Sequence, residues 1–318
     1  MFLEKFSRFV RRYHLVFRPA HKAAPAMPLV ADEGQFSVLD ALEKRRADGT
    51  ALLKQKNGDV LEMVKVEHFP ERGVLVLLFH RGSPDAADPM YRRRIEGGHT
   101  VRQAEKEEDE EQSVSAHLVI STKAIDDGRF DASLEEIPGI NMSLVQQIMA
   151  QALHEYPYDY QIGKRKIKTL ETVCLVKAEG LKSETISGAL KEGKIDFITF
   201  IKPAPAKYVD ADGLWEPMND IMRLKVKGKI DADGWQDKIG ALVEEARADG
   251  WEDFNIEIDL GNKRSKTIAL DREQDAKEIL FVKSEEIEVA TELSPCSVDF
   301  QDEVIDSCLA IMQPKVVP

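Results

Sequence analysis

The stretch from Met222 to Ile230 constrains the fold most, because its residue types alternate strictly. The cations stand at every second position and are Arg223, Lys225, Lys227 and Lys229. The positions between them are mostly apolar, as at Leu224 and Val226. A period of two predicts a strand with one buried face. The cations would then form a row on the solvated face, spaced about 7 Å apart.

Two interpretations of this row stay open. Phosphates repeat on a similar length scale along nucleic acid, so the row can follow a backbone. An edge strand also carries lysines simply to block pairing with another chain. Two further basic clusters favour the first interpretation. One precedes a predicted strand and consists of Lys164, Lys166 and Lys168. The other is at a predicted hairpin and consists of Lys263, Arg264 and Lys266. In a chain of net charge −13 such clusters indicate segregated charge.

The composition indicates a globular protein of the reducing cytoplasm. A length of 318 residues is typical of two domains. The three cysteines include no Cys-x-x-Cys pair and are too few for a disulfide framework. No apolar run reaches the length of about 18 residues that a membrane helix needs. We therefore expect a cytoplasmic location and no membrane span.

The predicted fold class is α+β, with mixed or antiparallel sheets, short helices and two strand–helix–strand units in the C-terminal half. In the N-terminal half, we expect helices at 37–48 and 143–154, capped by Ser37 and Ser143, and a hairpin turn at Asn57-Gly58. Strands are expected at 13–17, 51–56, 60–69, 74–80 and 113–121. Alternation with polar exposed faces predicts sheets open to solvent on one side.

The C-terminal half gives the two units. The first has strands at 168–177 and 195–201 around a helix at 183–191, and the second has strands at 221–230 and 254–260 around a helix at 234–248. We expect an N-terminal α+β domain over residues 1–160 with an acidic loop at 104–112, a domain with the basic strand over 161–290, and a helical tail over 291–318. The segment 81–112 reads as irregular, with Arg92, Arg93 and Arg94 as a basic arm.

No motif fixes a catalytic chemistry, and no cofactor or metal is predicted. Phosphate-binding glycine loops, nucleophile elbows and zinc-protease histidine spacings are all missing from the sequence. Arg94 and His99 have an Arg-x4-His spacing known from ribonucleases, but the glycines between them would break the helix this chemistry needs. Glu257 and Asp259 share one face of a predicted strand, and this pattern is typical of a solvent-exposed sheet surface. His117, in an apolar strand, is typical of a hydrogen-bonded core residue.

The order of elements resembles that of the RexA family, the phage-exclusion proteins of lambdoid phages. The resemblance covers residues 36–287, and its most specific part is the strand end Ile201-Lys202-Pro203. It implies a non-enzymatic, homodimeric, cytoplasmic protein that binds double-stranded DNA and acts in phage exclusion or a similar anti-phage defence. No site residue carries over from the family, so the candidate residues come from the charge pattern alone.

Three functions follow as hypotheses. The first, which we favour, is a non-enzymatic protein that binds double-stranded DNA largely without sequence preference. It would use the four cations of the row at 223–229 and the six cations of the two further basic clusters. The second is a metal-dependent nuclease whose carboxylates meet only in the fold. The third is a protein-interaction module without nucleic-acid binding, whose basic strand meets an acidic protein effector. The sequence alone does not choose between DNA, RNA and an acidic protein.

Overall fold

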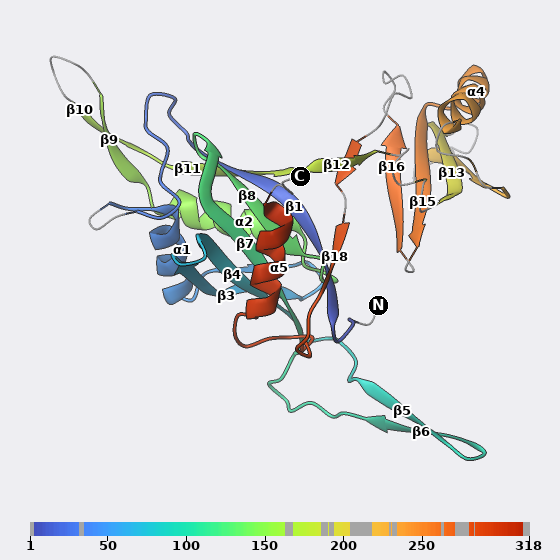
Figure 1. The fold of residues 1–318 in the computed structure, drawn as a ribbon, viewed down its shortest axis with the longest axis horizontal. Coiled ribbons are helices and arrows are strands. Elements are labelled where there is room, and N and C mark those ends of the chain that lie inside the picture. The colour runs from blue at the N-terminus through green and yellow to red at the C-terminus, as the bar shows by residue number, and fades with distance from the viewer. Residues whose placement is uncertain are drawn as a thin grey trace, which may run out of the picture. The chain divides into compact units, whose positions relative to one another are not determined.

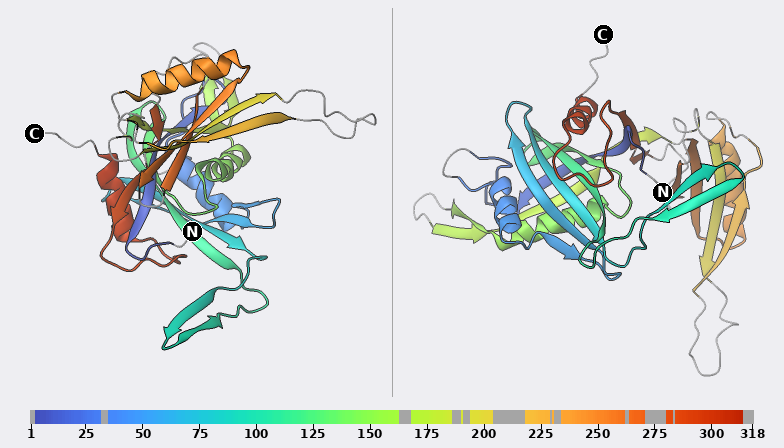
Figure 2. Two further views of the ribbon diagram at one scale, coloured as in Figure 1. Left: turned by 90° about the vertical axis from the view of Figure 1, so that its right-hand side faces the viewer. Right: turned by 90° about the horizontal axis from the view of Figure 1, so that it is seen from below.

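The computed structural model describes residues 3–31, 35–162, 168–185, 190, 194–203, 218–228, 230, 234–261, 264–270, 280–282 and 284–313. The chain forms two compact units, of which the first comprises residues 1–181 and 284–318 and the second residues 182–283. The fold class is α+β, as predicted, with antiparallel sheets (Figures 1 and 2). No helix among the described residues has the length and apolar character to span a membrane.

The second unit is an insertion into the first, which differs from the predicted boundaries after residues 160 and 290. The strands β11 (Cys174–Gly180) and β18 (Ser284–Glu288) flank the insertion, and both pair with β1 (Ser7–Pro19). The predicted C-terminal tail also belongs to the first unit, because α5 (Asp302–Met312) packs on its sheet. Chain segments far apart in sequence therefore share one sheet.

One antiparallel sheet of eight strands organises the first unit. Its spatial order is β11-β1-β8-β7-β4-β3-β2, and β18 also pairs with β1. The remaining strands are β2 (Leu52–Lys54), β3 (Val60–Phe69), β4 (Val74–Ser83), β7 (Gln112–Asp126) and β8 (Arg129–Glu135). No strand was predicted for the residues of β8.

Helices cover both faces of this sheet (Figure 1). On one face α1 (Val38–Ala47) and α2 (Met142–Glu155) bury side chains with Leu77 of β4. On the other face α5 packs with Val76 of the same strand. The prediction of a sheet open to solvent on one side is therefore wrong here, because β4 is buried at successive positions rather than at alternate ones.

Side-chain caps mark the N-terminal ends of α1 and α2. Ser37 caps α1 through a reciprocal pair of hydrogen bonds with Asp40, as predicted. The predicted cap of α2 is wrong, since the side chain of Asn141 rather than Ser143 accepts the hydrogen bond from the backbone N–H of Leu144, at 3.1 Å. The turn between β2 and β3 contains Gly58 with φ of 87°, as the predicted hairpin requires.

Among the described residues, three two-stranded sheets lie outside the two larger ones. They are formed by β5 (Met90–Ile95) with β6 (Gly98–Gln103), by β9 (Tyr158–Ile162) with β10 (Lys168–Thr172), and by β12 (Lys182–Thr185) with β17 (Leu280–Val282). The irregular segment predicted at 81–112 thus contains a regular hairpin. The predicted helix at 183–191 begins instead as strand, because its first residues pair with β17; of the others only Leu190 is described, and it is helical.

The second unit contains a four-stranded antiparallel sheet in the order β14-β13-β15-β16. Its strands are β13 (Lys194–Pro203), β14 (Asn219–Lys225), β15 (Asp253–Gly261) and β16 (Arg264–Leu270). The helix α4 (Trp235–Ala248) covers one face, where Trp235 is buried against Phe254 and Ile256. The strand–helix–strand unit predicted over 221–260 is confirmed.

Candidate nucleic-acid interface

A fully exposed hairpin carries the densest group of arginines that the structure describes. Every residue of β5 and of β6 is exposed to solvent. The two strands contain Arg92, Arg93, Arg94 and Arg102, against the single carboxylate of Glu96 in the turn. We call residues 90–103 the arginine arm. The sequence indicated a basic segment here but not its regular structure, because a strand exposed on both faces has no hydrophobic alternation.

The pairing of the strands assigns the arginines to both faces of the arm. Residues directly opposite one another share a face. Arg92 is opposite Val101, and Arg94 is opposite His99, so these four lie on one face. On the other face Arg93 is opposite Thr100, and Tyr91 is opposite Arg102. The arm therefore presents cations in two directions rather than as one row.

The arginines of β5 are available for a partner. Among the described residues no ion pair involves Arg92, Arg93 or Arg94. The guanidinium of Arg102 lies over the ring of Tyr91, with its central carbon 5.2 Å from the ring centroid. This stacking holds the charge of Arg102 without neutralising it. A guanidinium stays protonated at any physiological pH and binds phosphate through paired N–H groups.

Hydrogen bonds fasten the base of the arm. The backbone N–H of Ala104 donates to the carbonyl of Pro89 at 2.9 Å. The side-chain amide of Gln103 donates to Asp88 at 2.6 Å. The ammonium of Lys106 donates to the carbonyl of Pro84 at 2.6 Å. These contacts join the two chain segments that lead into and out of the arm, so the hairpin is closed at its root.

A buried carboxylate fixes the strand that leads into the arm. Asp59 is 3% exposed and accepts hydrogen bonds from the Ser83 hydroxyl at 2.5 Å, from Asn57 at 2.7 Å and from the paired Arg81. The hydrogen bond from Ser83, with those from Arg81 and Asn57, lowers the pKa of Asp59 below its usual value, although burial acts in the opposite direction. Ser83 ends β4, so this group secures the position from which the arm departs.

The acidic loop predicted at 104–112 follows the arm directly. Residues 105–111 contain six carboxylates, and all of these are exposed. Gln112 already opens β7, so the loop ends one residue earlier than predicted. The charge therefore changes sign along this part of the chain, from a cationic arm to an anionic segment at its base.

The predicted basic strand is only partly confirmed. Burial alternates along β14, with Arg223 and Lys225 exposed and Leu224 packed toward the core. The strand ends at Lys225, although the next residue, Val226, still donates its backbone N–H to the carbonyl of Asp196 on the neighbouring chain segment, at 2.9 Å. Lys227 is exposed but lies beyond the strand, and Lys229 lies outside the described residues.

The face of β14 is also less cationic than the sequence predicted. Arg223 lies over the ring of Phe197, 3.9 Å from its centroid, and forms an ion pair of 2.5 Å with Glu257. Lys194 on the same sheet lies 3.6 Å from Asp259. The sheet order causes this pairing, because β15 carries Glu257 and Asp259 on the solvated face beside β13. Glu257 and Asp259 thus lie on a solvent-exposed sheet face, as expected.

The other predicted cations do not form one described surface. Lys168 is exposed at the start of β10, while Lys164 and Lys166 lie outside the described residues. Lys263 lies outside them too, and for Arg264 and Lys266 only the backbone in β16 is described. Lys168 belongs to the first unit and the others of this set that are described belong to the second.

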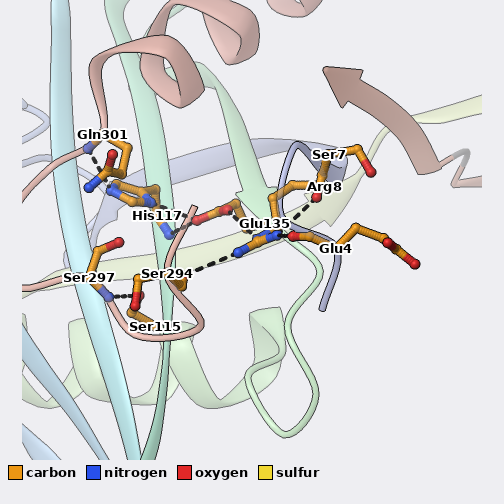
Figure 3. A network of polar contacts seen from close by, with 9 residues as sticks. All are labelled: Glu4, Ser7, Arg8, Ser115, His117, Glu135, Ser294, Ser297 and Gln301. Carbon is orange, nitrogen blue, oxygen red and sulfur yellow. Dashed lines mark hydrogen bonds and ion pairs between the residues drawn. The ribbon is translucent and has the colours of Figure 1, made fainter. Parts of the chain in front are cut away.

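A buried polar cluster was not predicted as a group, although His117 was expected to be a bonded core residue (Figure 3). The Nδ1 atom of His117 lies 2.6 Å from Oε2 of Glu135, and the backbone N–H of Gln301 donates to its Nε2 at 3.1 Å. Because Nε2 accepts, the ring proton is on Nδ1 and faces the carboxylate. The expected role of His117 is confirmed.

Arg8 completes this cluster. Its Nε lies 3.7 Å from Oε1 of Glu135, and both side chains are 4% exposed. One guanidinium nitrogen donates to the carbonyl of Ser294 at 3.1 Å. Burial lowers the pKa of Arg8, while Glu135 acts against this change. The cluster thus holds the segment before α5 to the sheet, through residues from both ends of the chain.

No catalytic arrangement emerges from the described geometry. In the part of the chain that the structure describes, no group of three or more His, Cys, Asp or Glu side chains is placed to hold a metal ion. Arg94 and His99 do face one another, but as an exposed cross-strand pair and not on a helix. Comparisons with protein-family models, curated proteins and solved structures find no match to this chain, so the resemblance to the RexA family stays a prediction.

Proposed function

We propose that this protein binds duplex DNA through the phosphate backbone, with little sequence preference, and that the arginine arm makes the principal contact. The observation that carries this proposal is the presence of four arginines on a two-stranded ribbon whose residues are all exposed. Exposed cations without carboxylate partners neutralise phosphates and release counterions, which supplies most sequence-independent affinity.

The shape of the arm favours DNA over double-stranded RNA. Two strands lie about 5 Å apart, and six residues span about 20 Å. The grooves of B-form DNA accept a two-stranded ribbon. The deep, narrow major groove of A-form RNA does not admit side chains in the same way. Cations on both faces of the ribbon would meet the phosphates on both walls of a groove.

The predicted basic strand becomes a secondary contact in this proposal. Lys225 and Lys227 are exposed, and the ion pair of Arg223 with Glu257 reduces its attraction for phosphate. A homodimer, a protein effector, a cytoplasmic location and a role in phage exclusion or anti-phage defence remain part of the proposal. They rest on the resemblance to the RexA family and on the composition.

A protein-interaction module is the second candidate function. Four large apolar side chains of the arm are exposed, namely Met90, Tyr91, Ile95 and Val101. Exposed apolar side chains beside cations are also typical of a surface that meets an acidic protein. No contact in the described structure favours the nuclease hypothesis over these two.

The salt dependence of binding tests the proposal. Four phosphate contacts give a slope of about −3.6 for log affinity against log salt concentration. Raising salt from 50 to 200 mM should therefore weaken binding about 150-fold. Replacing Arg92, Arg93 and Arg94 together by alanine should reduce the arm's contribution to the slope to about −0.9 and the corresponding loss of affinity to about 3.5-fold. Fluorescence anisotropy of a labelled duplex measures both.

A control variant with the same loss of charge makes the test specific. Lys54, Lys56 and Lys123 are exposed cations of the same unit outside residues 90–103, and their replacement by alanine should leave the slope near that of the wild type. Equal slopes for the arm and control variants would contradict the proposal. So would the absence of binding at low salt, which would favour the interaction module. Magnesium-dependent loss of the duplex would favour the nuclease.

A further inference from the structure

An apolar side chain stands at the end of the arm. Ile95 is the last residue of β5 and its side chain is 48% exposed. It is opposite Gly98, so no side chain covers it from the neighbouring strand. Gly97, with φ of 81°, makes the tight turn beside it, and the space around the missing Cβ atoms of both glycines is open. The turn thus leaves about half of the Ile95 surface exposed at the end of the arm.

The cations lie behind Ile95 on the same face. Arg93 is two residues earlier on β5, and Tyr91 with the stacked Arg102 comes next along this face. A ligand that met this face would first encounter an apolar side chain and then positive charge. The opposite face begins instead with Arg94 and His99, both polar. The two faces of the arm therefore differ in chemistry at the tip.

We propose that Ile95 acts as a wedge that enters between adjacent base pairs from the minor groove and kinks the duplex. This inference rests on the proposed DNA binding and names the form of DNA that the site prefers, namely a bendable duplex. Apolar wedges unstack one base step and bend DNA toward the major groove. Arg93 and Arg102 would then lie against the phosphates that flank the opened minor groove and would neutralise their charge.

A lipid surface is the other partner that exposed apolar and cationic side chains can indicate. The arm is less suited to a lipid surface than to DNA, because arginines interrupt the apolar residues on both of its faces. The turn itself carries the charged side chain of Glu96, which would have to enter the membrane first. Stacked bases offer a gap for one apolar side chain between two charged backbones, and this matches Ile95, the apolar side chain of the arm that lies beside the turn.

Binding and bending are measured together to test the wedge. A duplex of about 30 base pairs carries a donor and an acceptor dye at its ends, and energy transfer reports the bend while anisotropy reports affinity. The wild type should bend the duplex by about 20–90°. Ile95→Ala should bind within about threefold of the wild type yet lose most of the bend. Ile125→Ala, which changes an exposed apolar residue of β7 outside the arm, should retain both.

Each outcome decides the inference. Equal bending by the wild type and Ile95→Ala, or binding without bending by the wild type, would overturn the wedge and leave the proposed binding intact. An absence of binding by the wild type would remove both proposals, and the anisotropy shows this separately. Sedimentation with vesicles containing phosphatidylserine tests the lipid alternative. Loss of vesicle binding in Ile95→Ala with unchanged DNA bending would assign the tip to a membrane.

Discussion

Replacing Glu135 by glutamine should destabilise the first unit selectively. The substitution keeps the shape of the side chain but removes its charge. Glu135 is the buried counter-ion of Arg8 and accepts hydrogen bonds from the backbone N–H and from Nδ1 of His117, at 2.7 and 2.6 Å. The variant would leave the guanidinium of Arg8 buried without a compensating charge.

The magnitude follows from this burial. Removing one partner of a buried ion pair costs about 3–5 kcal/mol, because the remaining charge stays desolvated. A glutamine oxygen can still accept one hydrogen bond from His117, so we expect the lower end, about 3 kcal/mol. For a unit of this size, that loss corresponds to a fall in Tm of about 6–12 °C.

The distribution of tryptophan lets one sample report on both units. All three tryptophans, Trp215, Trp235 and Trp251, lie within residues 182–283, the second unit. Their fluorescence therefore follows the second unit, while far-UV circular dichroism also follows the large sheet of the first. In Glu135→Gln the dichroism transition should move to lower temperature, and the fluorescence transition should keep its wild-type midpoint.

A matched control separates a buried pair from an exposed one. Glu292→Gln breaks an ion pair with Lys5 in which the side chains are 58% and 67% exposed, and it should cost less than about 1 kcal/mol. A loss below about 1 kcal/mol in Glu135→Gln as well would refute the reasoning. It would mean that water or a neighbouring group compensates Arg8 when the carboxylate is neutralised.

Two further predictions concern local structure. Asn141→Ala should destabilise the protein by about 1 kcal/mol through loss of the α2 cap, whereas Ser143→Ala should change stability by less than about 0.5 kcal/mol. Urea denaturation measures both changes in stability. A larger loss in Ser143→Ala than in Asn141→Ala would contradict the observed cap. The pKa of Asp59 is lowered in the folded state, so its contribution to stability is present above the usual value of 3.8 and is lost as pH falls through the folded value. Unfolding midpoints between about pH 5 and pH 2 should therefore fall less steeply in Asp59→Asn than in the wild type, and equal slopes would show that Asp59 has an ordinary pKa.

The sequence predicted the elements whose patterns are local. A helical C-terminal tail was expected over 291–318, and the structure has the helix α5 within it, where apolar residues recur at helical spacing. The alternation at 222–230 correctly gave a strand with one buried face, although the strand ends at Lys225. The Asn57-Gly58 turn and the Ser37 cap are equally local, since one or two residues decide their geometry.

The arginine arm shows where such patterns fail. Both faces of β5 and β6 are exposed, so no buried side chain marks the period of two. The turn glycines Gly97 and Gly98 were visible, but without alternation they indicated a loop rather than a hairpin. The basic residues themselves were evident, and the sequence therefore predicted the charge of this site but not its shape.

Only the tertiary structure decided which charges remain available for a partner. Arg223 appeared to belong to a cationic row, yet the sheet order places Glu257 within 2.5 Å of it. Arg8, His117 and Glu135 are distant in sequence, and they meet because β1, β8 and β7 are neighbours. A sequence specifies local backbone preference and the burial of each face, but charge pairing depends on which strands become neighbours. That choice is made by long-range packing.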